Sequence, residues 1–502
     1  MDKWLFRRQF LCSDKPYQPN AYWKIEELPA GYFLSVHQDL PYKCRVEGQK
    51  ALVILGLFFD PLKPNKTTQE LIDDVWTHFD GFDDLFTTTK PFSGRWALIA
   101  IENGTVRLFT DACGFRTIFY RYVNQFFHFA SQPELLKKQH PLALKTEAYL
   151  TEFLQSEAYI RGESAWIGQQ TIYEDCYHLL PNHYFDTKQA APVRFYPNHA
   201  VAPVVENREA QLSLICRLLQ GTYQALIRQS SLMLPVTSGW DSRLLLAAAR
   251  NHLDDIQCYV QQLDGMDENH PDIQIPKSMS EQCGFSFEVH HLPQENVPDW
   301  FWQQIRTNVT NPRCLPKSSI IYNHLETNDQ RININGNGSE ICRNYFDKYG
   351  KHQGLKYTLD ELQFLLYGKN RVPEMFRVEI ASWMQDFDRN PMGYFSIGDL
   401  LYWEQRIGNW GAQFPAEQDI ARDEVSPFNC RLLLELMNAF PLSERSAPNF
   451  KLYHDLIAHM WPDLLDYPFN PHLKSHRADF KRLIRHAIPN RADTKIRRWL
   501  KS

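Results

Sequence analysis

The sequence predicts a mixed α/β protein: antiparallel strands come first, a doubly wound parallel sheet follows, and helices end the chain. Residues 1–195 contain alternating or continuous apolar runs joined by Gly turns, as antiparallel strands do. After residue 208, short apolar strands alternate with helical segments. That alternation is typical of a parallel sheet with helices on both faces.

Length and composition are those of a globular protein with more than one domain. The chain has 502 residues, of which 43% are hydrophobic and 23% charged, with a net charge of −5. No overall field therefore favours nucleic acid or a membrane. The apolar run 51–59 is about half as long as a membrane-spanning helix. Ten scattered cysteines, with no CxxC pair and no secretory signal, indicate reduced thiols. We therefore expect a soluble, cytoplasmic protein.

Two local signals predict elements in the first part. The dipeptide Asn103-Gly104 lies between two apolar strands, as in a tight hairpin turn. The segment 67–79 opens with Thr and Glu at capping-box spacing, which predicts a helix. The Pro- and Asn-rich stretch 196–207 then interrupts the strand pattern, and we take it as a domain boundary.

The second part predicts alternating helices and strands. A helix over 208–229 precedes the apolar strand of "SLMLPVTSGWDSRLLLAAAR" (231–250) and its following helix. Further strands are expected at 256–263, 287–292 and 331–338, with helices between them. The remainder, about 350–502, has a mostly helical pattern.

The turn after the strand at 231–236 is a candidate anion site. Ligands of open α/β sheets bind at the carboxyl ends of strands. Thr237, Ser238 and Gly239 are small enough for backbone N–H groups to approach an anion, and Ser242 adds a hydroxyl. Asp241 would repel phosphate unless a divalent cation lies between them. The alternative for Asp241 is a plain helix N-cap.

Other kinds of site are excluded by pattern. A Walker loop needs GxxxxGK[ST], which the sequence lacks. A nucleophile elbow needs small residues two positions either side of the serine, and neither Ser238 nor Ser242 has them. The sequence also lacks HExxH and Cys/His zinc spacing, so no structural zinc is expected.

The turn resembles the S-G-G-x-D-S ATP-pyrophosphatase loop of the asparagine synthetase family. Gly239, Asp241 and Ser242 match directly, and Thr237 and Ser238 keep a hydroxyl or a small size. About a hundred residues on, "RININGNGSEICRNYF" is similar to the family's second loop. There Gly336, Gly338 and Ser339 align, and Glu340 stands at the family's metal-binding aspartate. The alternative for Glu340 is a surface glutamate in a Gly/Asn turn.

The first part also resembles this family, in its glutaminase half. The matching residues of 92–136 are Gly94, Asp111, Gly114, Arg116, Tyr120, Ser131 and Leu136. The resemblance implies an N-terminal αββα sandwich of the N-terminal-nucleophile hydrolase (Ntn) type over 1–195. It further implies an ATP-pyrophosphatase domain over 208–475, with C-terminal helices, and a basic helical tail over 476–502.

The chain departs from the family at several functional positions. The family's N-terminal cysteine is Asp2 here, and the first cysteine is Cys12, so we expect no glutamine hydrolysis. The family's glutamate between the two glycines is Asn337, which cannot act as a general base.

Two cations are candidates for phosphate contacts. Lys474 is the nearest candidate for the family's phosphate-binding lysine, or else one more cation of the basic tail. Arg343 is suited to phosphate, or else makes a surface salt bridge.

The resemblance implies an ATP-dependent, AMP-forming amide synthetase that uses ATP and Mg²⁺. Asp241 and Glu340 would hold the metal. The phosphates would be held by residues 237–242 together with Gly336 and Gly338. The strand 256–263 would pass beside the adenine. A carboxylate of a small molecule or peptide would be adenylated and then attacked by an amine or ammonia. The alternatives are a macrolactam or peptide-modifying cyclase of the same family and a non-catalytic nucleotide-binding scaffold.

The end of the chain is strongly basic. Residues 471–502 hold ten lysine or arginine residues and two aspartates, a net charge of +8. A basic tail can bind anionic lipid, RNA or a phosphorylated substrate, or form a solvated helix face. We favour the solvated face and do not expect a nucleic-acid partner. A homo-oligomer is compatible with the sequence.

Overall fold

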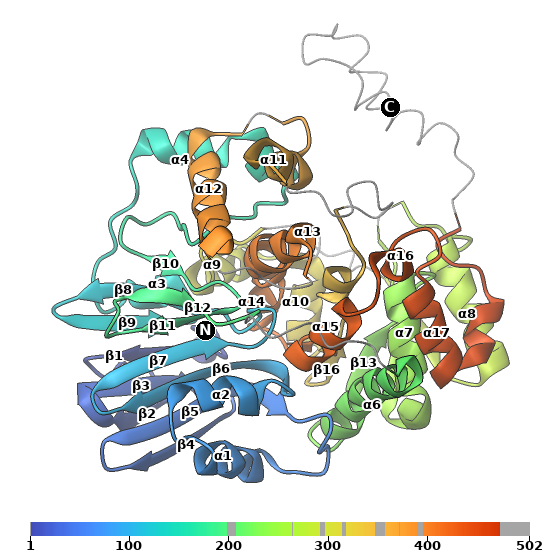
Figure 1. The fold of residues 1–502 in the computed structure, drawn as a ribbon, viewed down its shortest axis with the longest axis horizontal. Coiled ribbons are helices and arrows are strands. Elements are labelled where there is room, and N and C mark those ends of the chain that lie inside the picture. The colour runs from blue at the N-terminus through green and yellow to red at the C-terminus, as the bar shows by residue number, and fades with distance from the viewer. Residues whose placement is uncertain are drawn as a thin grey trace, which may run out of the picture.

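The fold combines antiparallel and parallel sheets. The structure, a computed structural model, describes residues 2–197, 207–263, 265–291, 297–313, 318–346, 357–370, 372–389 and 395–471. These residues form two six-stranded antiparallel sheets and one five-stranded parallel sheet (Figure 1). The predicted mixture of strand arrangements is therefore confirmed. The predicted basic tail, 476–502, lies outside the described residues.

The two antiparallel sheets belong to the first part of the chain. The order of the first sheet is β10 (Tyr177–His178), β8 (Phe119–Val123), β9 (Phe126–Ala130), β1 (Phe10–Ser13), β3 (Tyr32–His37) and β2 (Trp23–Leu28). The order of the second is β12 (Ala191–Arg194), β11 (His183–Asp186), β7 (Thr105–Thr110), β6 (Ser93–Glu102), β5 (Lys50–Phe59) and β4 (Tyr42–Glu47). Apolar side chains from both sheets, such as Leu34 and Val53, share one buried core, so the sheets pack face to face.

Short helices cover the outer faces of these sheets. Helices α1 (Thr68–Thr77) and α2 (Phe82–Thr89) pack on the second sheet through a core that includes Leu71 and Leu85. Helix α3 (Pro133–Leu136) packs on the outer face of the first sheet. The central strands therefore have one face in the shared core and the other under helices or loops, whereas the edge strands β2 and β4 are partly exposed.

Both local signals in this part of the chain are confirmed. Asn103 and Gly104 connect β6 to β7 and both have positive φ, at 51° and 77°, as a tight hairpin turn requires. Thr67 caps α1, and Glu70 closes a reciprocal capping box with it.

The parallel sheet belongs to the second part. Its order is β15 (Phe287–His290), β14 (Ile256–Gln261), β13 (Leu232–Pro235), β16 (Ile332–Ile334) and β17 (Glu424–Val425). All neighbouring pairs are parallel. In chain order this is 3-2-1-4-5, so the direction of strand addition reverses between β13 and β16. In such sheets ligands bind outside the carboxyl ends of the strands at the point of reversal.

Helices lie along this sheet. Helices α6 (Arg208–Ile227), α7 (Trp240–Ala249) and α17 (Lys451–Met460) share a buried core with β13 and β16. Helix α8 (Pro271–Cys283) follows β14 in the chain. Helices α9 (Asp299–Asn308) and α10 (Ser318–Glu326) follow β15. Leu232 and Leu234 of β13 pack in the core with α7, and Met233 between them points to the other face of the sheet. Buried Arg422 contacts both Met233 and His324 of α10, so α10 lies on the opposite face from α7.

The last part is mostly helical, as predicted, but it also supplies an edge strand. Its helices are α11 (Leu359–Tyr367), α12 (Glu374–Arg389), α13 (Ile397–Leu401), a π-helix (Tyr402–Gly411), α14 (Gln413–Gln418), α15 (Arg431–Asn438) and α16 (Leu442–Arg445). Strand β17 has two residues and was not predicted, because so short a segment has no periodicity of its own.

One late helix returns to the first part of the chain. Figure 1 shows α12 beside α4 (Glu147–Leu154), which is followed by α5 (Glu157–Arg161). Phe153 of α4 stacks on Phe376 of α12 with ring centroids 4.9 Å apart.

Among the described residues, no helix is long and apolar enough to cross a membrane.

A buried ion cluster joins the antiparallel sheets to the approach to β17. Arg95 donates two hydrogen bonds to the carboxylate of Asp419, at 2.6 and 2.8 Å, and Arg116 donates a third at 3.2 Å. Arg8 donates to Asp423 at 3.0 Å. Since Asp419 and both of its arginines are buried, these charges depend on one another.

We expect Asp419→Ala to lower the free energy of unfolding by about 3–5 kcal/mol, because two buried guanidinium groups lose their counter-charge. Chemical denaturation measures the change. The control is Asp73→Ala, which removes a partly exposed partner of Arg45 and should change stability by about 1 kcal/mol or less. Equal effects of the two changes would contradict this account of the interface.

Candidate functional site

The two predicted loops lie side by side at the reversal point of the parallel sheet. Residues 237–242 follow β13, and residues 335–340 follow β16. These strands are hydrogen-bonded neighbours, with Leu232 opposite Ile332. Because the strands are parallel, both loops emerge at the same edge of the sheet.

The first loop is closed by its own hydroxyl groups. The hydroxyls of Thr237 and Ser242 lie 2.9 Å apart, and the N–H of Gly239 donates to the Thr237 hydroxyl at 3.2 Å. Gly239 is the N-cap of α7 and makes no side-chain capping bond. The hydroxyls that were predicted to face an anion therefore also hold the loop in shape.

Ser238 already holds an anionic group. Its N–H and its hydroxyl both donate to one carboxylate oxygen of Asp272, at 2.9 and 2.6 Å. Asp272 lies in the first turn of α8, which follows β14. This loop therefore donates hydrogen bonds to a carboxylate of the same chain. A phosphate that bound to the N–H of Ser238 would have to displace Asp272. Asp272 was not among the predicted site residues, because its only local signal is its position at the start of a predicted helix.

Asp241 reaches across to the second loop. One of its oxygens accepts from the hydroxyl of Ser339 at 2.7 Å, and the other lies 2.8 Å from Arg343. Arg343 is also 3.6 Å from Glu340. Asp241 is therefore not an N-cap, and Arg343 is not a surface ion pair but a bridge between two carboxylates.

Burial sharpens the electrostatics of this group. The side chain of Glu340 is 21% exposed and that of Arg343 is 17% exposed. Burial and the charge of Asp241 raise the pKa of Glu340 to about 7, against the opposing effect of Arg343. Burial alone would lower the pKa of Arg343, but Asp241 and Glu340 help to raise it above its ordinary value. The oxygen Oε2 of Glu340 is buried and has no hydrogen-bond partner among the described residues.

The glycines of the second loop allow this close approach. A Cβ atom on Gly336 would lie 3.1 Å from the Cβ of Asp241, tighter than most side-chain contacts. Gly338 has φ of 92°, and a Cβ there would lie 3.1 Å from the sulfur of Cys113 in the first part of the chain. Small residues at both positions therefore bring the two loops together and seat them against the antiparallel sheets.

A buried carboxylate outside the predicted set shapes the second loop. Glu424 of β17 accepts from the side-chain amides of Asn333 and Asn335, at 2.8 and 2.9 Å. Asn335 in turn accepts from the N–H of Asn337 at 3.1 Å, and the hydroxyl of Ser426 donates to the Asn337 carbonyl at 2.6 Å. Asn337 is therefore held through its backbone.

The end of the described chain folds over the first loop. The N–H of Asn470 donates to the Ser238 carbonyl at 3.1 Å. Trp240 stacks on Phe469 with ring centroids 3.6 Å apart, and buried Arg243 donates to carbonyls of this segment. Lys474, the predicted phosphate contact, lies outside the described residues.

The donor set suits Mg²⁺, a hard cation that is commonly held by one or two carboxylates together with phosphate oxygens. Asp241 and Glu340 supply the carboxylates, and the unpartnered Glu340 oxygen is available to such an ion. Arg343 would compete with the ion for these carboxylates, because it contacts both.

Comparisons with known proteins do not assign the chain to a family. No family model matches, and no curated protein matches. Among solved structures, the chain is similar to a glutamine phosphoribosylpyrophosphate amidotransferase from B. subtilis complexed with ADP and GMP. The identity is 7%, the match covers 68% of this chain and 73% of that chain, and the TM-score is 0.21. A likeness at that score carries no argument about function.

The raised pKa of Glu340 predicts a pH-dependent loss of stability. The folded protein holds this proton more tightly than the unfolded chain, so stability falls as pH rises from the ordinary value of 4.5 through about 7. We expect Glu340→Gln, which carries no charge, to gain on the order of 2 kcal/mol relative to the wild type between about pH 5 and about pH 8. Denaturant titrations at both pH values measure this. The exposed Glu281→Gln change is the control, and an unchanged difference between wild type and Glu340→Gln would contradict the prediction.

Proposed function

We propose that the chain is an ATP-dependent, AMP-forming ligase. A substrate carboxylate attacks the α-phosphorus of ATP, which gives an acyl-adenylate and releases pyrophosphate. An amine or ammonia then attacks the acyl carbon, which forms an amide and releases AMP. The observation that supports this proposal is the meeting of Asp241 and Glu340, from loops about a hundred residues apart in the sequence, at Arg343.

The residues of the two loops would divide the work. Backbone N–H groups of 237–242, at the start of α7, would face the phosphates, where the helix end favours negative charge. Asp241 and Glu340 would hold Mg²⁺, which when bound supplies positive charge against the β- and γ-phosphates. Arg343 would neutralise the two carboxylates before nucleotide arrives and then remain available to phosphate oxygens.

The first part of the chain supports an external source of the amine. Cys12, the first cysteine, is fully buried in β1, and burial raises its thiol pKa to about 12. It is therefore protonated at neutral pH and is a poor nucleophile. Free ammonia or an amine-bearing substrate is the better-supported donor.

Two contacts favour a second candidate function, a nucleotide-binding protein without catalysis. Arg343 lies where it competes with a metal, and Asp272 occupies the N–H of Ser238. If neither group yields to ligand, nucleotide would bind without pyrophosphate release.

The test is release of AMP and pyrophosphate from ATP with a panel of carboxylic acids and ammonium or amines. We expect Asp241→Asn to lower the rate at least about 100-fold, as loss of one charge-stabilising group at a reacting phosphate does. Asp254→Asn, an exposed change on the same part of the chain, is the control. Nucleotide binding without release under every condition would favour the second candidate, and equal release by both variants would overturn the ligase proposal.

Arg343 provides a second, independent prediction. We expect Arg343→Ala to bind Mn²⁺, a substitute for Mg²⁺, about tenfold more tightly in the absence of nucleotide, because the competing guanidinium is gone. Calorimetry of the purified chain measures the affinity. Adding Asp241→Asn to Arg343→Ala should remove the gain. An unchanged Mn²⁺ affinity in Arg343→Ala would contradict the view that the two carboxylates form a cation site.

A further inference from the structure

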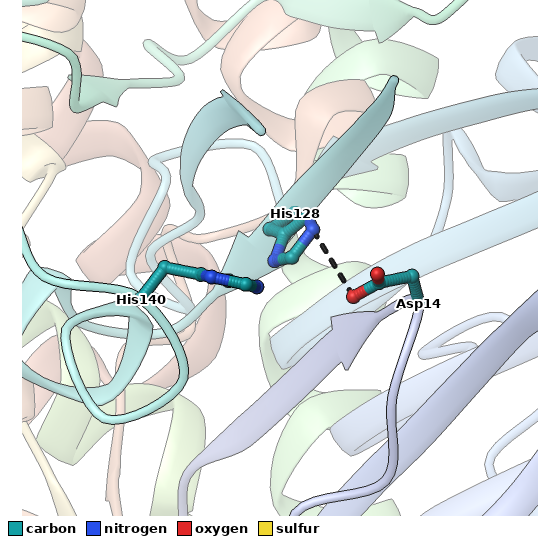
Figure 2. Close-up of side chains that lie close together, drawn as sticks. All are labelled: Asp14, His128 and His140. Atoms are coloured by element: carbon teal, nitrogen blue, oxygen red, sulfur yellow. Dashed lines mark ion pairs between the residues drawn. The ribbon is translucent and has the colours of Figure 1, made fainter. Parts of the chain in front are cut away.

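A second group of potential metal ligands lies in the first part of the chain, away from both loops of the candidate site. Asp14, His128 and His140 each offer one ligand atom, and these atoms all lie within 4.8 Å of one another. Figure 2 shows the side chains of His140 and Asp14 directed toward the His128 ring. The Nε2 atom of His128 is 3.3 Å from an Asp14 oxygen, and the two histidine rings are 5.2 Å apart.

Strand pairing brings these residues together. Asp14 directly follows β1, and His128 lies in the neighbouring strand β9, where Leu11 pairs with Ala130. Side chains alternate along a strand, so His128 faces the same side as Ala130. That side is the outer face of the sheet, on which α3 packs. His140 comes from the loop just after α3, which crosses this face.

The ligand atoms are buried without hydrogen-bond partners. Asp14 Oδ1, His128 Nε2 and His140 Nε2 are all inaccessible to solvent, and none has a hydrogen-bond partner among the residues that the structure describes. The His128 side chain is 1% exposed. Buried polar atoms are normally paired, because an unpaired one loses its water without compensation. Asp14 Oδ1 and His128 Nε2 contact each other as an ion pair at 3.3 Å without forming a hydrogen bond, so a ligand shared with His140 Nε2 would satisfy all three atoms.

Other contacts hold the group in place without using these atoms. Arg121, paired with His128 across β8 and β9, donates to the carbonyls of His140 and Pro141 at 3.1 and 3.0 Å. The side-chain amide of Gln139 donates to the Lys15 carbonyl at 2.6 Å. The loop after α3 is thus tied to β8 and to the segment that follows β1 by neighbouring residues. The arrangement is preformed, which lowers the entropy lost on binding a ligand.

The chemistry of the group selects the kind of metal. Two imidazoles and one carboxylate suit Zn²⁺ and related transition metals, whereas Mg²⁺ and Ca²⁺ prefer several oxygen ligands. The 3.3 Å between His128 Nε2 and the Asp14 oxygen matches the edge of a tetrahedral zinc site, about 3.3 Å for bonds of about 2.0 Å.

We propose that Asp14, His128 and His140 bind one zinc-class transition-metal ion, with a fourth position left to water, and that this ion ties β1, β9 and the loop after α3 together. Sites with three protein ligands and one open position are common for zinc. Local Cys/His spacing in the sequence predicted no structural zinc. Such spacing does not detect ligands that are separated by more than a hundred residues, as Asp14 and His128 are. The proposal is independent of the ligase proposal, because it uses neither loop.

The test uses the full-length, untagged chain after treatment with a chelator. Zinc titration should give one equivalent bound per chain, and zinc should raise the thermal midpoint by a few degrees. His140→Gln and Asp14→Asn should each lower zinc affinity at least about tenfold and abolish the thermal shift. Replacement of zinc by Co²⁺ should give the visible absorption of tetrahedral coordination in the wild type and lose it in His140→Gln.

Two controls make the result specific. His78→Gln changes an exposed histidine of the same part of the chain, and Asp241→Asn changes the candidate nucleotide site. Both should keep the zinc and the Co²⁺ spectrum. Circular dichroism shows whether His140→Gln is folded. A folded His140→Gln variant tests the zinc site even if Asp14→Asn unfolds. No zinc binding by the wild type, or equal affinity in His140→Gln, would overturn the proposal.

Discussion

The hydrogen-bonded pairing of β13 with β16 is the constraint on which the candidate site depends. These strands lie about a hundred residues apart in the sequence and are neighbours in the sheet, with Met233 opposite Asn333. Any strand order without this pairing would separate the two loops that follow them. With it, Asp241 and Ser339 are within hydrogen-bond distance, and Arg343 reaches both carboxylates. The glycines at 336 and 338 are then needed, since larger residues would meet Asp241 and Cys113.

Charge balance follows from this geometry. The carboxylates of Asp241 and Glu340 lie close enough to repel each other, and burial together with the charge of Asp241 raises the pKa of Glu340. The positive charge of Arg343 reduces the repulsion between the two carboxylates. The carboxylate of Asp272 accepts a hydrogen bond from the N–H of Ser238. The Asp241 carboxylate and the Ser238 N–H therefore already have partners from this chain. Ligand binding at such a site is an exchange of partners, so affinity depends on how readily Arg343 and Asp272 give way.

The sequence predicted those elements of the fold that neighbouring residues determine. Asn103-Gly104 specifies its turn, Thr67 and Glu70 specify a helix start, and the strand before Thr237 has the apolar run of a buried strand. It did not predict Asp272, Glu424 or the group at His128. These depend on which distant elements become neighbours, and nothing in the adjacent residues signals that. The motif loops were found because each is compact in sequence, but the role of Arg343 as a bridge between carboxylates needed the sheet.

We propose that the loops after β13 and β16 form one metal-dependent pyrophosphate site. A crystal structure with Mn²⁺ and an ATP analogue that cannot be cleaved between the α- and β-phosphates tests it most directly, because anomalous scattering locates the metal. The account predicts manganese between Asp241 and Glu340, with the β- and γ-phosphates against residues 237–242. Nucleotide bound elsewhere, or Arg343 still bridging both carboxylates in the nucleotide complex with no metal beside them, would contradict it.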